Sequence, residues 1–137
     1  MKKLNSTNEV VRILEEEGIL VPEDFSRNLK KNANRFGESY VPSSEQVYAI
    51  TKACNYWKSY VKNETEFSKL VVNSIFSMAR VGAVVIRSNR ILEDNTCIAD
   101  ICKVKNEKEL PECTIIVVSR MGECKIQRGF ATPLVEF

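Results

Sequence analysis

The sequence predicts an α+β fold in which N-terminal helices, including an antiparallel helical hairpin, are followed by a C-terminal antiparallel β-sheet. Apolar residues recur at steps of three and four up to about residue 81, which is the period of a helix. After Gly82 β-branched residues become dense, as in strands. With no internal repeat or evident linker in 137 residues, we expect one domain, 1–137. Its parts are N-terminal helices at 1–38, the helical hairpin at 43–81 and a β-region at 83–137.

The N-terminal part predicts two helices. The first, TNEVVRILEEE at 7–17, carries Val10, Val11 and Leu14 on one side and ends at Gly18. The second begins near Pro22, with acidic residues in its first turn, and continues to Gly37. It is the most basic of the predicted helices, which fits either a solvated surface or one that faces an anion.

The hairpin begins with a capping-box pattern, Ser43-Ser44-Glu45-Gln46. Its first helix has an apolar stripe at helical spacing, formed by Val47, Ile50, Cys54, Trp57 and Val61. Its second helix has another, formed by Phe67, Leu70, Val71, Ser74, Ile75 and Met78. Val72, Phe76 and Ala79 extend this apolar surface sideways, beyond what one partner helix can cover. We therefore expect the hairpin to pack on the sheet or on another subunit.

Strands are expected in AVVIRS (83–88), in NTCIADICKV (95–104) and in a hairpin over ECTIIVVSRMGECKIQRGF (112–130). Two registers are open for that hairpin. A two-residue turn at Met121-Gly122 would place Ile116 and Val118 on the face shared with Gln127 and Lys125, whereas a turn with a bulge at Gly122 places them with Ile126 and Cys124. The second gives one apolar face, so we favour it.

Composition argues for binding rather than catalysis. The chain has no histidine, which removes the commonest general base near neutral pH, and it has no glycine-rich phosphate loop. Its net charge of +2 is too small to indicate duplex DNA. The five cysteines show no zinc-type pairing, so we expect reduced, buried thiols and neither a metal nor a cofactor. With no membrane-length apolar run and no signal-like start, we expect a cytoplasmic protein.

The stretch NRFGESYVPSSEQVYAI at 34–50, with its asparagine-arginine-phenylalanine, tyrosine and proline before a two-helix hairpin, resembles the hairpin domain of phage signal sponges. That domain is shared by the anti-CBASS and anti-Thoeris sponges. The β-structure expected after the hairpin makes this chain similar to the anti-Thoeris family (Thoeris anti-defence protein, first type). The resemblance implies a non-catalytic protein of the infected cell's cytoplasm. It would be a homo-oligomer, dimer or hexamer, that sequesters glycocyclic ADP-ribose and can also hold cyclic oligonucleotides at a separate hairpin-borne site.

Such ligands call for cations against phosphates and an aromatic or apolar plate against the base. At the hairpin, the matching motif provides Arg35 and Tyr40, with Lys52 one helical stripe away. Tyr40 can equally form a hydrophobic clasp with Phe36 over the next helix. For the second site, chemistry rather than a matched motif indicates Arg87, Asn89, Asp94, Asn95, Arg120 and Arg128, with Phe76 or Phe130 as the plate. Each of these arginines could instead be a surface salt-bridge partner.

Two other functions fit the same sequence. One is a small phage or plasmid protein-interaction module that inhibits a host protein through the wide hairpin surface. The other is a single-strand nucleic-acid binder that uses the basic second helix, although the net charge of +2 counts against it.

Overall fold

A computed structural model describes residues 7–33, 41–81, 84–87, 97–106, 115–118 and 124–127. In chain order, the elements are α1 (Thr7–Glu16), α2 (Phe25–Ala33), α3 (Ser44–Cys54), the 3-10 helix η2 (Asn55–Tyr60), α4 (Glu64–Val81), β1 (Val84–Arg87), α5 (Ile98–Ile101), β2 (Ile115–Val118) and β3 (Cys124–Gln127). None of the helices in these ranges combines the length and the apolarity that a bilayer-spanning segment needs.

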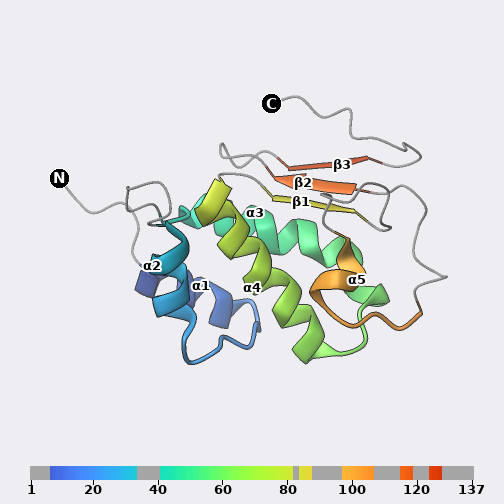
Figure 1. Ribbon diagram of the computed structural model, residues 1–137, viewed down its shortest axis with the longest axis horizontal. Coiled ribbons are helices and arrows are strands. Elements are labelled where there is room, and N and C mark those ends of the chain that lie inside the picture. Colours follow the sequence, from blue (N-terminus) through green and yellow to red (C-terminus); the bar gives the residue numbers. More distant parts are fainter. Residues whose placement is uncertain are drawn as a thin grey trace.

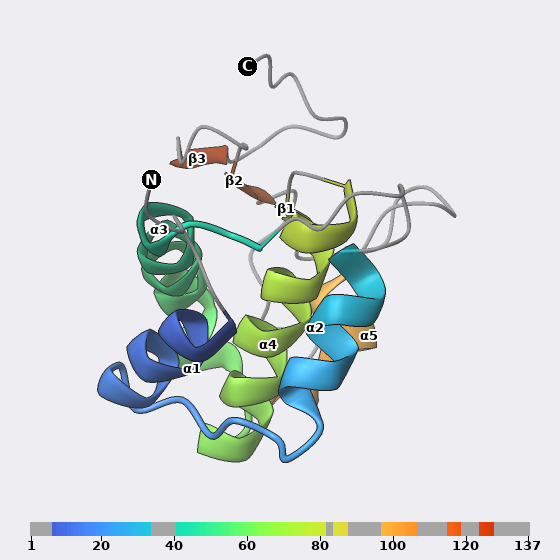
Figure 2. The same cartoon turned by 90° about the vertical axis from the view of Figure 1, so that its left-hand side faces the viewer.

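Helix α4 lies at the centre, and the other elements pack around it (Figures 1 and 2). The chain runs out along α3 and η2 and returns along α4, while α2, α5 and β1 contact α4 from other sides. Both apolar stripes predicted for the hairpin are confirmed, because every one of their residues is buried. The helices of the hairpin are therefore stabilised more by the burial of these two apolar stripes than by helix propensity.

The expected capping box is present at the start of α3. The Gln46 N–H donates to Ser43 Oγ at 3.1 Å, and the Ser43 N–H donates to Gln46 Oε1 at 2.8 Å. These two bonds satisfy backbone donors that the first turn of a helix leaves unpaired.

The wide side of α4 is covered by α2. Phe76 stacks on Phe25 with ring centroids 5.4 Å apart, and Phe25, Leu29 and Val72 are buried. Among the described residues, a helix of the same chain therefore covers this side of α4. The expected packing of the hairpin on the sheet is also present, because α3 contacts β2 and β3 and α4 contacts β1.

The N-terminal helices differ in how well their ends were predicted. Helix α1 ends at Gly18 as expected: Gly18 has φ +81°, its N–H donates to the Glu15 carbonyl, and the Ile19 N–H donates to the Leu14 carbonyl. This is a Schellman ending, which needs a left-handed residue after the helix. Helix α2 begins at Phe25, not near Pro22: residues 19–22 are not helical, and the Leu20 N–H is bonded to Ser68 Oγ of α4.

The predicted fold class is wrong. The described part of the chain is mostly helical, and the described residues of 83–137 include the helix α5 as well as three strands of four residues each. The stretch expected as a strand at 95–104 contains α5 instead. Its apolar residues Cys97, Ile98, Ile101 and Cys102 follow steps of one, three and one, which suits one side of a helix better than the alternation of a strand.

Within the described ranges, β1, β2 and β3 form a small antiparallel sheet in that order, with four residues in each strand. The register of β2 and β3 is the one the sequence favours, with Ile116 opposite Ile126 and Val118 opposite Cys124. Val84, which pairs with Val118, is buried, so this face of the sheet is turned toward the helices. The sheet is a small layer beside α3 and the end of α4 (Figure 1).

The cysteines whose side chains are described, Cys54, Cys97 and Cys102, are buried, reduced thiols, as the sequence predicted. Burial and, to a lesser extent, the nearby Glu66 carboxylate raise the pKa of the Cys102 thiol to about 11. Cys102 therefore stays protonated near neutral pH and behaves as a small apolar residue.

A substitution at Gly18 tests the ending of α1. Nothing lies within 4 Å of the position that a Cβ would take, so the cost of Gly18→Ala comes from the left-handed backbone alone. We expect a loss of about 1–2 kcal/mol in the free energy of unfolding, measured by urea titration. Glu15→Ala, at an exposed position of α1, should change it by less than about 0.5 kcal/mol. Equal effects of the two variants would contradict this account.

Candidate functional site

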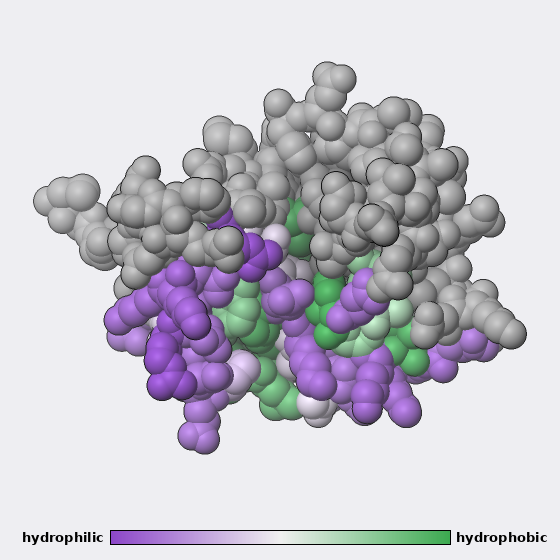
Figure 3. Space-filling view, viewed as in Figure 1, coloured by the Kyte–Doolittle hydropathy of each residue, from purple (hydrophilic) through white to green (hydrophobic). Residues whose placement is uncertain are grey.

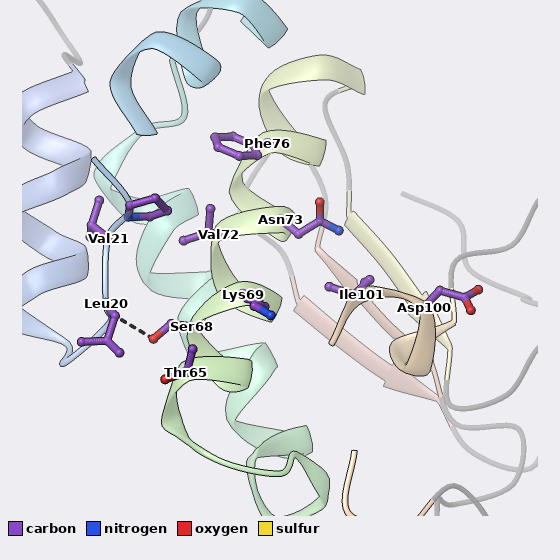
Figure 4. A pocket seen from close by; sticks show the side chains of 11 residues that line it. Leu20, Val21, Thr65, Ser68, Lys69, Val72, Asn73, Phe76, Asp100 and Ile101 are labelled. Atoms are coloured by element: carbon purple, nitrogen blue, oxygen red, sulfur yellow. Dashed lines mark hydrogen bonds between the residues drawn. The ribbon is translucent and has the colours of Figure 1, made fainter. Parts of the chain in front are cut away.

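A pocket of about 480 Å³ opens on the face of α4 that lies between the α1–α2 linker and α5 (Figure 4). On the same side of the molecule, hydrophobic residues gather in a hollow between hydrophilic ones (Figure 3). The lining comes from three segments: Leu20, Val21 and Pro22 of the linker; Thr65, Ser68, Lys69, Val72, Asn73 and Phe76 of α4; and Asp100 and Ile101 of α5.

The α4 residues line the pocket because of their spacing. Thr65, Lys69, Asn73 and Phe76 follow one another at steps of four and three, so they lie along one side of the helix. Val72 and Ser68 border this stripe on the linker side, and both are buried. The floor of the pocket is therefore the mainly polar stripe from Thr65 to Phe76, and Val72 adds apolar surface at its edge on the linker side.

The linker is fixed to α4 at one point. The Leu20 N–H donates to Ser68 Oγ at 2.8 Å, shown by the dashed line in Figure 4. Buried Ile19 anchors the linker just before this bond. The Leu20 side chain remains 56% exposed at the rim. An exposed leucine beside a pocket adds apolar surface that a ligand could cover.

The opposite wall is positioned by a buried carboxylate. Glu66 is only 7% exposed. Its Oε1 accepts the Lys103 N–H at 2.8 Å, and its Oε2 lies 3.0 Å from Lys69 Nζ. Lys103 directly follows α5 and Cys102, so Glu66 connects α4 to the segment that carries Asp100 and Ile101.

Backbone bonds hold the same segment from its other side. The Lys62 N–H donates to the Lys103 carbonyl at 3.0 Å, and the Lys105 N–H donates to the Tyr60 carbonyl at 2.8 Å. These bonds flank an isolated antiparallel bridge between Val61 and Val104. The α5 wall is thus tied both to α4 and to the end of η2.

The predicted site residues are only partly within reach of the structure. Phe76 lines the pocket as a predicted base-stacking plate should, but its stack on Phe25 already occupies one ring face. Lys52 is exposed on α3 and does not line the pocket. Arg87 lies in β1, and its side chain is outside the described residues, as are Arg35, Tyr40, Asn89, Asp94, Asn95, Arg120 and Arg128.

The hairpin motif is described from Val41 onward. Pro42 is buried at the entry to α3. Near the other end of the undescribed stretch 34–40, Arg80 Nη1 donates to Asn32 Oδ1 at 3.2 Å, which links the end of α4 to the end of α2. The described residues on both sides of the stretch 34–40 are therefore attached to the same helical core.

Sequence reasoning missed the remaining pocket residues. The linker was interpreted as the start of a helix, and the α5 segment as a strand, so neither was expected to face α4. Thr65, Lys69 and Asn73 do show the four-residue step that could have indicated a common stripe.

Comparison with known proteins finds no protein family, no curated protein and no solved structure that matches this chain significantly. The resemblance to phage sponges therefore depends on the residues of the motif itself.

The position of Glu66 predicts a pH effect. The Lys103 N–H and the Lys69 ammonium lower the pKa of Glu66 below its ordinary value of 4.5. A lowered folded-state pKa means that the stabilisation is complete above about pH 4.5 and disappears as the pH falls through the folded-state pKa. Lys69 and Lys103 favour the ionised form, whereas burial opposes it.

We expect Glu66→Gln to flatten this dependence. Between about pH 6 and about pH 3.5, the urea midpoint of the wild-type protein should fall more than that of the variant. The other carboxyl groups are common to both proteins, so they do not contribute to the difference. Parallel curves would show that Glu66 is not the coupled group.

Proposed function

We propose that this protein binds and sequesters a cyclic nucleotide immune signal without converting it. The observation that supports this most is the pocket beside α4, which contains the predicted plate residue Phe76. Its volume of about 480 Å³ lies within the roughly 300–1,000 Å³ of small-molecule sites. By its resemblance to phage sponges, its ligand is glycocyclic ADP-ribose or a cyclic oligonucleotide. The same resemblance implies a homo-oligomer that acts in the cytoplasm of an infected bacterium.

The side chains in the pocket suit the parts of such a molecule. Val72 and Phe76 offer apolar surface to a base. Lys69 offers a cation to a phosphate, while Asn73 and Asp100 offer hydrogen bonds to ribose hydroxyls. Because these groups come from different segments, a compact ring-shaped ligand could contact several of them at once.

The arrangement favours binding over turnover. A hydroxyl nucleophile needs a general base beside it, and the sequence contains no histidine. The Ser68 hydroxyl is buried and already accepts the Leu20 N–H. Lys69 is paired with Glu66 rather than with a hydroxyl of the pocket.

A capture-and-release assay tests the proposal. The protein is incubated with glycocyclic ADP-ribose, and in parallel with cyclic di-AMP. It is then separated from free ligand and heated, and the released nucleotide is identified by mass spectrometry. We expect one of the two to be recovered intact. At about 100 times Kd, it should also stabilise the fold by about 2.7 kcal/mol.

Two outcomes would contradict sequestration. Disappearance of the nucleotide with formation of a product would indicate an enzyme. Absence of any binding, together with co-purification of a host protein, would indicate an inhibitory protein-interaction module. Phe76→Leu, which keeps an apolar side chain against Phe25, should weaken binding by roughly 5- to 100-fold if the ring stacks on a base.

A further inference from the structure

The pocket has two chemically different sides (Figure 4). Val21 and Val72 lie on the linker side, and Phe76 lies at the end of the same apolar wall. Lys69, Asn73 and Asp100 lie toward α5. A ligand that fills this space must therefore present an apolar surface to one side and polar groups to the other.

Lys69 is able to change partner. Its side chain is 55% exposed, and its contact with Glu66 is a pair three residues apart on the same helix. Such partly exposed pairs contribute little to stability. Releasing Lys69 would not strand the Glu66 carboxylate, because Oε1 keeps its hydrogen bond from the Lys103 N–H.

Local charge limits what the site can bind. Among the described residues that line the pocket, Lys69 is the cation, and it is accompanied by the acids Asp100 in the lining and Glu66 behind it. A single ammonium opposed by two carboxylates suits a phosphate that carries one negative charge. It does not suit a terminal phosphate or triphosphate, whose further charges would meet the carboxylates.

We propose that Lys69 exchanges Glu66 for a phosphodiester or pyrophosphate group of the ligand, while the base lies against Val72 and Phe76. The inference rests on the proposed function and adds the orientation and charge of the ligand. Asp100, on the same side as Lys69, accepts hydrogen bonds from the sugar hydroxyls. The site then selects a ring with one negative charge per phosphorus, because such a ring exposes no terminal phosphate.

The test measures dissociation constants by calorimetry, with whichever of glycocyclic ADP-ribose and cyclic di-AMP binds the wild-type protein. We expect Lys69→Gln to weaken binding roughly 10- to 100-fold and to reduce its salt dependence, while Lys69→Arg retains most of the affinity. Lys31→Gln is the matched control: it removes an equal charge from an exposed lysine of α2 that does not line the pocket, and it should leave the affinity unchanged.

Glu66→Gln distinguishes an exchange of the partner of Lys69 from a merely structural role of the Glu66–Lys69 pair. Glutamine keeps an oxygen for the Lys103 N–H but no longer competes for Lys69, so we expect equal or tighter binding, by up to about fivefold. Combined with Lys69→Gln, it should give no gain. A linear nucleotide with a terminal phosphate, 5′-pApA for cyclic di-AMP or AMP for glycocyclic ADP-ribose, should bind at least tenfold more weakly than the ring.

The two levels of the proposal fail differently. If neither cyclic nucleotide binds the wild-type protein, the proposed function is overturned and this inference with it. If one binds, but Lys69→Gln matches the wild-type affinity and salt dependence, only the role of Lys69 is overturned. Marked loss of binding in Glu66→Gln would overturn the exchange of partners.

Discussion

The structure depends on the burial of α4. This 18-residue helix is apolar around most of its circumference, and such a helix needs partners on several sides. Ser74 contacts Cys54 of α3, Phe76 stacks on Phe25 of α2, and Glu66 reaches the segment after α5. The stripe formed by Thr65, Lys69 and Asn73 stays exposed. The linker and α5 are therefore drawn to α4 on either side of that stripe, and the space between them is the pocket.

Glu66 connects this packing to the chemistry of the pocket. One of its oxygens places the α5 wall, and the other holds Lys69 beside the opening. A buried carboxylate is costly unless it is paired and hydrogen-bonded, and both conditions are met here. The carboxylate that places the α5 wall in the free protein therefore also holds the cation that the proposed ligand would bind.

Sequence reasoning predicted what local pattern determines. The two apolar stripes of the hairpin, the capping box at Ser43 and the glycine stop at Gly18 depend on neighbouring residues, and all three were correct.

Sequence reasoning failed where tertiary contacts determine the local structure. Residues 19–22 are not helical, and buried Ile19 and the bond from Leu20 to Ser68 fix them on α4. In 97–102, burial of Cys97, Ile98 and Cys102 stabilises a one-turn helix whose apolar residues also allowed a strand. Phe76, which the sequence suggested as a stacking plate, lines the candidate pocket, and its role there stays a prediction. Ser68, Lys69 and Asp100 meet only because distant segments pack together.

The most direct test of the account is to map the bound nucleotide on the protein by amide chemical shifts. Glycocyclic ADP-ribose, or cyclic di-AMP if only that binds, would be titrated into the isotope-labelled full chain. The account predicts that the largest changes fall on Leu20 and Val21, on α4 between Thr65 and Phe76, and on Asp100 and Ile101. Changes confined to α3 and η2, or no change at saturating nucleotide, would contradict it.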